Sequence, residues 1–258
     1  MRHTRRETIK ETLNDNGYVI AQELVAQFKV SSETIRRDLE RLELEGHAQR
    51  VHGGAVSVRR NLNETAYQLR QKDHAQEKHA LARAAAEMIC DGDTVLIAPG
   101  TTTLGVAAYL HEKNNLTVIT NSLPVAMELA NSEGVSVFCL GGRVRGEDYS
   151  SSGVMSLDNL EIFNTNKLIM SIGGITPDRG LTDYRMDESA LVRSFIDNAD
   201  CVIGIADHSK FGVVSRYNIC PAARLTHLIT DSGTPEILYK PYQEAGVHVH
   251  VIPAYLDF

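Results

Sequence analysis

Residues 31–42 of this chain are SSETIRRDLERL, and their pattern predicts a helix with one buried face. Ile35, Leu39 and Leu42 stand at positions i, i+4 and i+7, so they share a single apolar stripe. The arginines of the stretch lie off that stripe, where they can reach the phosphates or base edges of DNA. The stretch therefore predicts a recognition helix with a basic outer surface.

The neighbouring residues supply the rest of a DNA-binding head. Two earlier apolar groups, around residues 9–13 and 24–28, predict two helices, and only residues 29–31 separate the second from the recognition helix. Helices joined by so short a turn form a helix-turn-helix. Gly46 suits the end of the third helix, and residues 47–58 predict a two-stranded wing that turns at Gly53-Gly54.

The alternative for this region is an ordinary charged, solvated helix in a helical domain. The arginine pair, the short turn and the glycine turn each stand where groove docking requires them, so together they favour DNA binding. The predicted DNA contacts are Ser31, Ser32, Glu33, Thr34, Arg36, Arg37, Arg41, Arg50 and His52.

Composition and charge separate the head from the rest. The 258 residues carry a net charge of −7, yet residues 1–60 hold eleven Lys/Arg against nine Asp/Glu and the remainder is net −9. An acidic body repels DNA and leaves the head as the docking surface. No apolar run approaches a membrane span, and the four cysteines are widely spaced, which predicts a cytoplasmic protein with reduced thiols and no membrane partner.

The chain divides into a head at 1–58, a polar linker at 59–74 with a helical turn near 67–69, and a body at 75–258. In the body, apolar runs alternate with helical patterns, which predicts an α/β domain with a mainly parallel sheet covered on both faces. The runs are 95–98, 116–120, 135–140, 168–172, 201–206, 228–230 and 247–251, and the helices lie near 104–112, 123–131, 156–163, 187–198 and 235–245.

Small, hydroxyl and charged residues follow five of these runs. Residues 99–103, PGTTT, combine a glycine, three hydroxyls and the start of a helix, which suits a phosphate, although a threonine-rich cap without a ligand is equally consistent with this loop alone. Lys210, within DHSKFG at 207–212, is well placed to oppose the phosphate charge. Ligands bind at the carboxyl ends of parallel strands, so the five ends predict one site.

The chain resembles the DeoR family of bacterial sugar-metabolism repressors over nearly its whole length. The head carries the resemblance in SETIRRDL at 32–39 and RVHGGA at 50–55. The body carries it in GTTT at 100–103, TNS at 120–122, Gly141-Gly142, GLT at 180–182, Glu188 and DHSKFG at 207–212.

This resemblance implies a winged helix-turn-helix joined to a domain similar to ribose-5-phosphate isomerase and the CoA-transferases. It further implies a repressor of a carbohydrate-utilisation operon that a phosphorylated sugar releases from its operator. The predicted effector site comprises Gly100, Thr101, Thr102, Thr103, Asn121, Ser122, Gly141, Gly142, Glu188, Asp207, Ser209 and Lys210.

Two positions depart from the family pattern. Ala98-Pro99 precedes the threonine loop where family members commonly have an aspartate, and Asn166-Lys167 stands where an aspartate often precedes the fourth strand. Two carboxylates that would contact sugar hydroxyls or the domain interior are thus absent.

A second hypothesis is a sugar-phosphate isomerase in which Glu188 and Lys210 act on the C1/C2 protons and the enediolate. The missing carboxylates and the complete DNA-binding head favour a regulator instead, either a repressor or an activator. No cofactor is predicted. His248 and His250 alternate on one strand face, but no third ligand is spaced nearby, so no metal site is predicted. One head reads few bases, so a homo-oligomer, a dimer or tetramer joined through the body, is expected.

Overall fold

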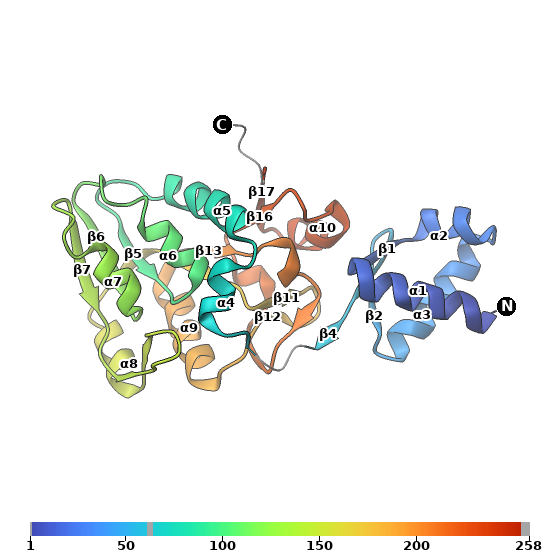
Figure 1. The fold of residues 1–258 in the computed structure, drawn as a ribbon, viewed down its shortest axis with the longest axis horizontal. Coiled ribbons are helices and arrows are strands. Elements are labelled where there is room, and N and C mark those ends of the chain that lie inside the picture. Colours follow the sequence, from blue (N-terminus) through green and yellow to red (C-terminus); the bar gives the residue numbers. More distant parts are fainter. Residues whose placement is uncertain (1, 61–63, 254–258) are drawn as a thin grey trace.

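The computed structural model of the chain describes residues 2–60 and 64–253, in which a small helical head is followed by a larger α/β body (Figure 1). Residues 61–63 of the predicted linker and the last five residues of the predicted body lie outside the described ranges. No helix within the described ranges combines the length and the apolar character that crossing a bilayer requires.

The head is built on three helices: α1 (Arg2–Asn16), α2 (Ala21–Phe28) and α3 (Ser32–Leu44). Ile35, Leu39 and Leu42 of α3 are buried together with Ile9 and Leu13 of α1, as the apolar spacing predicts. The turn between α2 and α3 is three residues long and passes through a left-handed residue at its start. The predicted helix-turn-helix is confirmed.

The wing contains one strand more than its sequence indicates. Strands β2 (Ala48–Val51) and β3 (Gly54–Ser57) form the predicted antiparallel pair, and β1 (Tyr18–Ile20) pairs with the other edge of β3. Three residues are too few to show a strand period. Gly54 is required here because a Cβ at this position would lie 2.0 Å from a backbone oxygen of β1.

The body contains a seven-stranded sheet in which every neighbouring pair is parallel. Its order is β17-β16-β13-β10-β5-β6-β7. The strands are β5 (Thr94–Ile97), β6 (Leu116–Thr120), β7 (Val135–Cys139), β10 (Thr165–Ser171), β13 (Ala199–Ile205), β16 (His227–Asp231) and β17 (His248–Ile252). These strands overlap the seven apolar runs, and the predicted parallel sheet is confirmed.

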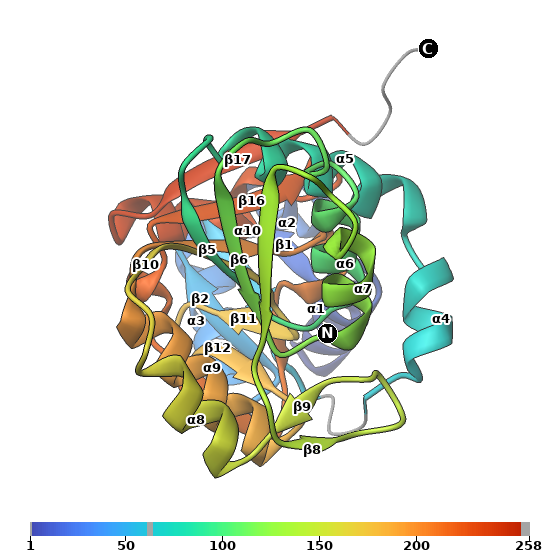
Figure 2. The same cartoon turned by 90° about the vertical axis from the view of Figure 1, so that its left-hand side faces the viewer.

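Helices cover both faces of this sheet (Figure 2). One face packs on α5 (Ala75–Glu87), α6 (Thr101–Ala107) and α7 (Leu123–Leu129), and the other on α8 (Val154–Leu160), α9 (Met186–Asn198) and α10 (Glu236–Glu244). The strand β5 shows the alternation, since Val95 and Ile97 join one core and Leu96 joins the other. Burial on both faces explains why the strands read as continuous apolar runs.

A second, smaller sheet was not predicted. It is antiparallel and consists of β11 (Gly174–Thr176), β12 (Gly180–Asp183) and β15 (Tyr217–Cys220), with an irregularity between β12 and β15. Two short pairs were also missed, β8 (Arg143–Val144) with β9 (Ser151–Ser152), and β4 (Arg59–Arg60) with β14 (Val213–Val214). Strands of two to four residues, one of them interrupted, give little alternation for a sequence to display.

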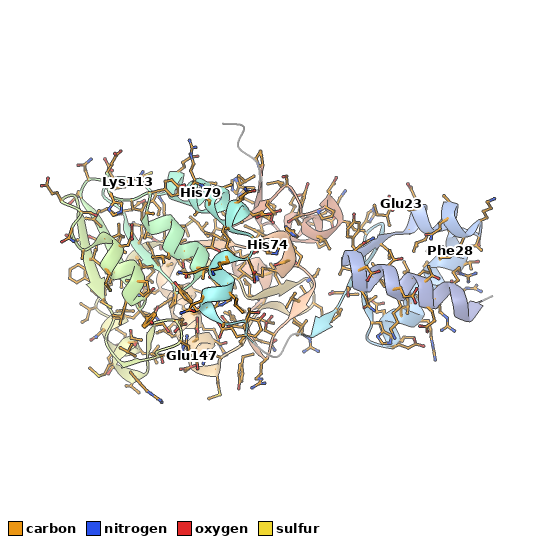
Figure 3. The ribbon with its side chains drawn as sticks, viewed as in Figure 1. Glu23, Phe28, His74, His79, Lys113 and Glu147 are labelled. Atoms are coloured by element: carbon orange, nitrogen blue, oxygen red, sulfur yellow. The ribbon has the colours of Figure 1, made fainter. Side chains whose placement is uncertain are left out.

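The predicted linker contains regular structure. The strand β4 begins it, and the helix α4 (Tyr67–Lys72) occupies the place of the expected helical turn. Figure 3 shows His74 where this segment meets α5, on the side of the body that carries α4.

The strand order reverses once in the large sheet. From β5 the chain adds β6 and β7 on one side, then crosses back to place β10 on the other side of β5 and continues outward through β13, β16 and β17. At such a reversal the connections leave in opposite directions, so a crevice opens at the carboxyl ends of the two central strands.

Candidate functional site

A cavity of about 160 Å³ lies at this reversal, beyond the carboxyl ends of β5, β10 and β13. That volume is several times the roughly 30 Å³ that one water molecule occupies in the liquid, so the cavity has room for a small molecule. The strand ends contribute Ala98, Pro99, Thr101, Thr102, Ser171, Ile172, Gly173, Ala206, Asp207, Ser209 and Lys210.

Six of the twelve predicted effector residues line this cavity. They are Thr101, Thr102, Glu188, Asp207, Ser209 and Lys210. The other six, Gly100, Thr103, Asn121, Ser122, Gly141 and Gly142, are not among its lining residues. For four of these, Asn121, Ser122, Gly141 and Gly142, the division follows the sheet, because β6 and β7, after which they come, lie beyond β5 on the far side from β10.

Predicted effector residues that lie outside the cavity have structural roles instead. Thr103 is fully buried and its hydroxyl donates to the Gly100 carbonyl at 3.1 Å. The Asn121 amide donates to the Ser151 carbonyl at 2.7 Å, and Ser122 caps α7. A Cβ at Gly142 would lie 2.5 Å from a backbone oxygen, so this glycine serves close packing.

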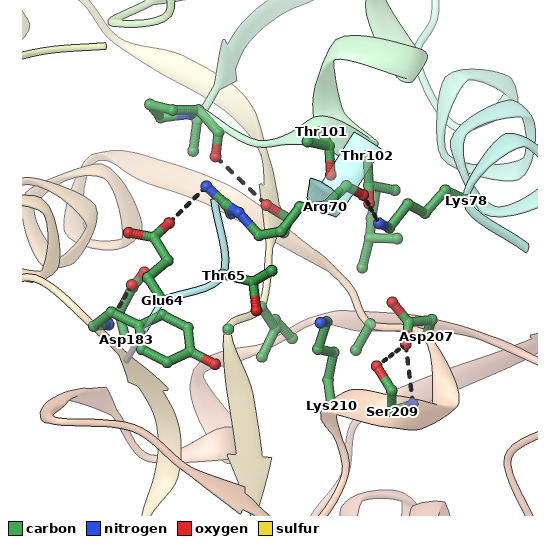
Figure 4. A pocket seen from close by; sticks show the side chains of 18 of the residues that line it. Glu64, Thr65, Arg70, Lys78, Thr101, Thr102, Asp183, Asp207, Ser209 and Lys210 are labelled. Carbon is green, nitrogen blue, oxygen red and sulfur yellow. Dashed lines mark hydrogen bonds and ion pairs between the residues drawn. The ribbon is translucent and has the colours of Figure 1, made fainter. Parts of the chain in front are cut away.

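Three cationic side chains line the cavity, Lys210, Lys78 and Arg70 (Figure 4). The ammonium group of Lys78 donates to the backbone carbonyls of Arg70 and, at 2.7 Å, of Asp73. Burial lowers the pKa of Lys78, which the nearby Asp207 partly offsets. Lys210 therefore stands beside a second positive charge on the β13 side of the cavity.

Asp207 keeps its negative charge in this setting. Burial alone raises the pKa of Asp207, but the positive charge of Lys210 and the hydrogen bonds from Ser209 outweigh it and hold the pKa below its usual value. The carboxylate thus positions the 208–210 turn and neutralises part of its charge.

The carboxyl groups of Asp183 and Glu188 also line the cavity. The Glu188 side chain is 14% exposed and accepts a hydrogen bond from Arg145 at 2.6 Å. Burial raises the pKa of Glu188, as does the nearby charge of Asp183, and burial also raises the pKa of Asp183. One of the two carboxyl groups is therefore expected to keep its proton at a pH at which an exposed carboxyl group is ionised.

No sequence pattern indicates that the segment joining head and body belongs to the site. Glu64, Thr65, Arg70, Asp73 and His74 nevertheless line the cavity. A polar stretch of weak periodicity is typical of a solvated linker, so the contribution of these side chains depends on how the segment folds back over the sheet.

The two departures from the family pattern fall in different places. Ala98 lines the cavity, so its missing carboxylate bears on the site. Asn166 lies inside β10 at its amino end, and its side-chain oxygen accepts a hydrogen bond from the Thr94 backbone at the start of β5. The expectation that this position could contact a sugar is wrong, because it stands at the opposite end of the strands from the cavity.

The predicted DNA contacts lie on one surface of the head, along α3 and the wing. All nine are exposed except Thr34, which is half-buried. Ser31 caps α3 by accepting from the Thr34 backbone at 3.3 Å, and His52 stands at the turn of the wing. The site is a raised helix beside a hairpin, which is the geometry of major-groove docking.

The arginines of this surface are paired with glutamates of the same head. Arg36 bridges Glu33 and Glu40 at 2.8 and 2.7 Å, and Arg37 also reaches Glu33. The hydrogen bond from Arg36 is the main cause that lowers the pKa of Glu33 to about 2. Phosphates or bases must compete with these carboxylates for the arginines.

The positive charge of Arg5 is paired with a carboxylate inside the head. It binds the buried Asp38 of α3 at 2.6 Å, with both side chains largely covered. This ion pair fixes α1 against the recognition helix, so Arg5 is not available to a phosphate in this arrangement.

The histidines of the neighbouring strands β16 and β17 contact one another. His227 approaches His250 at 3.0 Å between ring nitrogens, and His248 lies on the same patch. Across residues 2–60 and 64–253, no cluster of three or more His, Cys, Asp or Glu side chains is arranged to hold a metal ion.

Comparison with known proteins gives matches over both parts of the chain. Residues 5–64 match the DeoR-like helix-turn-helix domain, and residues 73–232 match the DeoR C terminal sensor domain. The chain is 33% identical to the HTH-type transcriptional regulator GolR of Listeria innocua, covering 96% of this chain and 97% of that protein. It is 35% identical to the glycerol-3-phosphate regulon repressor of Escherichia coli, covering 91% and 93%.

Among solved structures, the chain is similar to ribose 5-phosphate isomerase A from Methanocaldococcus jannaschii. The identity is 15% and the TM-score is 0.40, over 56% of this chain and 55% of that one.

The raised pKa of Glu188 predicts that the folded protein becomes less stable as pH rises. An acid whose pKa is higher when folded holds its proton longer than in the unfolded chain. The free energy of unfolding therefore falls as pH rises above 4.5, the ordinary pKa of a glutamate, by up to about 1.4 kcal/mol per pH unit. We expect Glu188→Gln to remove this dependence, so that the variant gains on the wild type in urea unfolding from about pH 5 to about pH 8.

The matched control is Glu87→Gln, which changes an exposed carboxylate of α5. A difference in unfolding free energy between Glu188→Gln and wild type that stays constant with pH would contradict the assignment.

Proposed function

This chain belongs to the DeoR family of DNA-binding transcriptional regulators, as the sequence motifs predict, and we propose that it represses a carbohydrate-utilisation operon until a phosphorylated sugar occupies the cavity. It is a regulator and not an enzyme. The chemistry of the cavity supports the release of DNA by a sugar phosphate.

The observation that carries the proposal is that cations, hydroxyls and carboxyl groups line the same cavity. Lys210, Lys78 and the hydroxyls of Thr101 and Thr102 line it, as do the carboxyl groups of Asp183 and Glu188. A phosphate needs cations and donors, and sugar hydroxyls need acceptors. A small molecule that carries both a phosphate and hydroxyls finds partners for both in this cavity.

The proposed ligand set follows the cavity. Lys210 supplies the positive charge, Thr101 and Thr102 donate to the phosphate, and Glu188 accepts from sugar hydroxyls. Asn121, one of the predicted effector residues, does not line the cavity, and its amide donates to the Ser151 carbonyl, so it is omitted from the set.

Assembly is the second part of the proposal. Beside the edge strand β7, apolar side chains are exposed on Met127, Phe138, Met155 and Ile162, and α7, β7 and α8 all lie at the end of the body away from the head (Figure 1). An edge strand with exposed apolar neighbours favours contact with a second copy.

Light scattering on the full chain tests the assembly. We expect at least a dimer at micromolar concentration, and Phe138→Lys should shift the population toward monomer because it places a charge on the edge strand itself. A wild-type monomer that binds operator with full affinity would contradict this part of the proposal.

The head predicts a specific effect on DNA binding. We expect Arg36→Ala or Arg37→Ala to weaken operator binding by roughly 1–3 kcal/mol if the side chain reads a guanine, and to reduce the salt slope if it holds a phosphate. Fluorescence anisotropy with labelled operator at several salt concentrations measures both quantities.

The control is Lys240→Ala, which removes an exposed charge from α10 in the body. Retention of wild-type affinity and an unchanged salt slope in the Arg36/Arg37 double variant would rule out this docking surface.

The cavity predicts that a variant can lose its response to sugar phosphates and still bind operator DNA. We expect Lys210→Ala to bind operator as the wild type does, but to show no rise in melting temperature and no release from operator with a panel of triose to hexose phosphates. Lys210 lies in the body, and its loss removes the charge that opposes the phosphate.

The unphosphorylated sugars of the same panel serve as the control, because they lack the group that Lys210 is proposed to bind. A Lys210→Ala protein that titrates with a sugar phosphate like the wild type would show that the 207–212 loop is not the phosphate site.

A further inference from the structure

The segment that joins the head to the body forms one wall of the cavity. Thr65 and Arg70 of this segment line the cavity opposite Lys210, with Arg70 above and Lys210 below in the view of Figure 4. Both residues lie between the two parts of the chain that match family models, 5–64 and 73–232. The wall is thus made by the very residues that lead to the DNA-binding head.

Two anchors hold the segment against the body. At its start, Glu64 pairs with Arg185 at 2.8 Å. At its end, Lys78 of α5 donates to the carbonyls of Arg70 and Asp73. Between these anchors the backbone has little freedom to turn its side chains away from the cavity.

The segment also touches the loop that carries Lys210. The rings of His74 and His208 meet edge to face with centroids 4.8 Å apart, and His208 is held by Asp231 at 3.0 Å. The same loop continues into β14, which pairs with β4 next to the head. A ligand that moves or fixes the 207–212 loop therefore affects the segment between head and body at two places, through β4 near its start and through His74 at its end.

Arg70 has hydrogen-bonding capacity to spare. One terminal amino group pairs with Glu64 at 2.6 Å, while the Nε atom is buried and meets no acceptor in the part of the chain that the structure describes. A buried N–H without an acceptor is costly, and a guanidinium presents several donors in one plane. An anionic group in the cavity would supply the missing acceptor.

We infer that Arg70 is a second cation of the effector site, so that an anionic ligand held between Arg70 and Lys210 fixes the interdomain segment to the body. This inference rests on the proposed function and adds the route by which an occupied cavity acts on the head. The ligand restrains residues 64–74, and with them the position from which the head can reach DNA.

Inorganic phosphate is the probe for this inference, with chloride at equal ionic strength as the reference. On the full-length protein, amide hydrogen exchange across residues 64–74 reports the segment and the melting temperature reports binding. In the wild type we expect phosphate to slow exchange in the segment and to raise the melting temperature.

Three variants separate the contributions. Arg70→Gln should weaken phosphate binding about tenfold, the usual size for one charge-assisted hydrogen bond, and should lose the slowed exchange at 64–74 even at saturating phosphate. Arg70→Lys keeps the charge and should restore part of both effects. Arg83→Gln, the same change on an exposed arginine of α5, should behave as the wild type.

Two outcomes overturn the inference in distinguishable ways. If Arg70→Gln keeps wild-type phosphate affinity and slowed exchange while Lys210→Ala loses both, the phosphate site stands and Arg70 has no part in it. If neither phosphate nor the sugar phosphates stabilise the wild type, the proposed function fails and this inference fails with it.

Discussion

The reversal of strand order between β5 and β10 is the constraint on which the rest of the site depends. Parallel strands end together at one edge of a sheet, and their helices normally cover that edge. Where successive connections leave in opposite directions, the edge stays open. The cavity forms there because β5, β10 and β13 deliver their polar ends side by side, and because β6 and β7 carry theirs away.

The distribution of charge favours DNA binding at the head and phosphate binding in the cavity of the body. Residues 61–258 are net −9 and residues 1–60 are net +2, so DNA meets a favourable potential only at the N-terminal part of the chain. Inside the cavity the signs are mixed, with lysines near Asp207 and carboxyl groups near α9. A phosphate is repelled by the body as a whole and accepted only where Lys210 and its neighbours concentrate positive charge.

The head could be predicted from the sequence because its three helices bury single apolar stripes. Ile35, Leu39 and Leu42 are spaced for one helix face, and that face is buried in the structure. The large sheet could be predicted for a similar reason, since strands buried on both faces are apolar throughout. The third strand of the head and the β11-β12-β15 sheet could not, because their strands are too short to show a period.

The site was only partly predictable, because sequence gives the ends of strands but not their order. Five strand ends looked equivalent, yet only those next to the reversal meet, so Thr101 and Lys210 line the cavity whereas Asn121 and Gly141 do not. Asn166 does not line the cavity because it stands at the amino end of β10, whereas the cavity lies at the carboxyl ends of the strands. Arg70 gave no signal at all, since its role depends on a segment that folds back across the sheet edge.

Binding of a sugar phosphate to the free and the operator-bound protein tests whether the cavity and the DNA-binding head are coupled. Two sites that influence each other must do so equally in both directions. We expect the sugar phosphate to bind operator-bound protein more weakly, by the factor by which it weakens operator binding. Equal affinity for the two forms, measured by calorimetry with saturating operator, would show that the cavity and the DNA-binding head are not coupled.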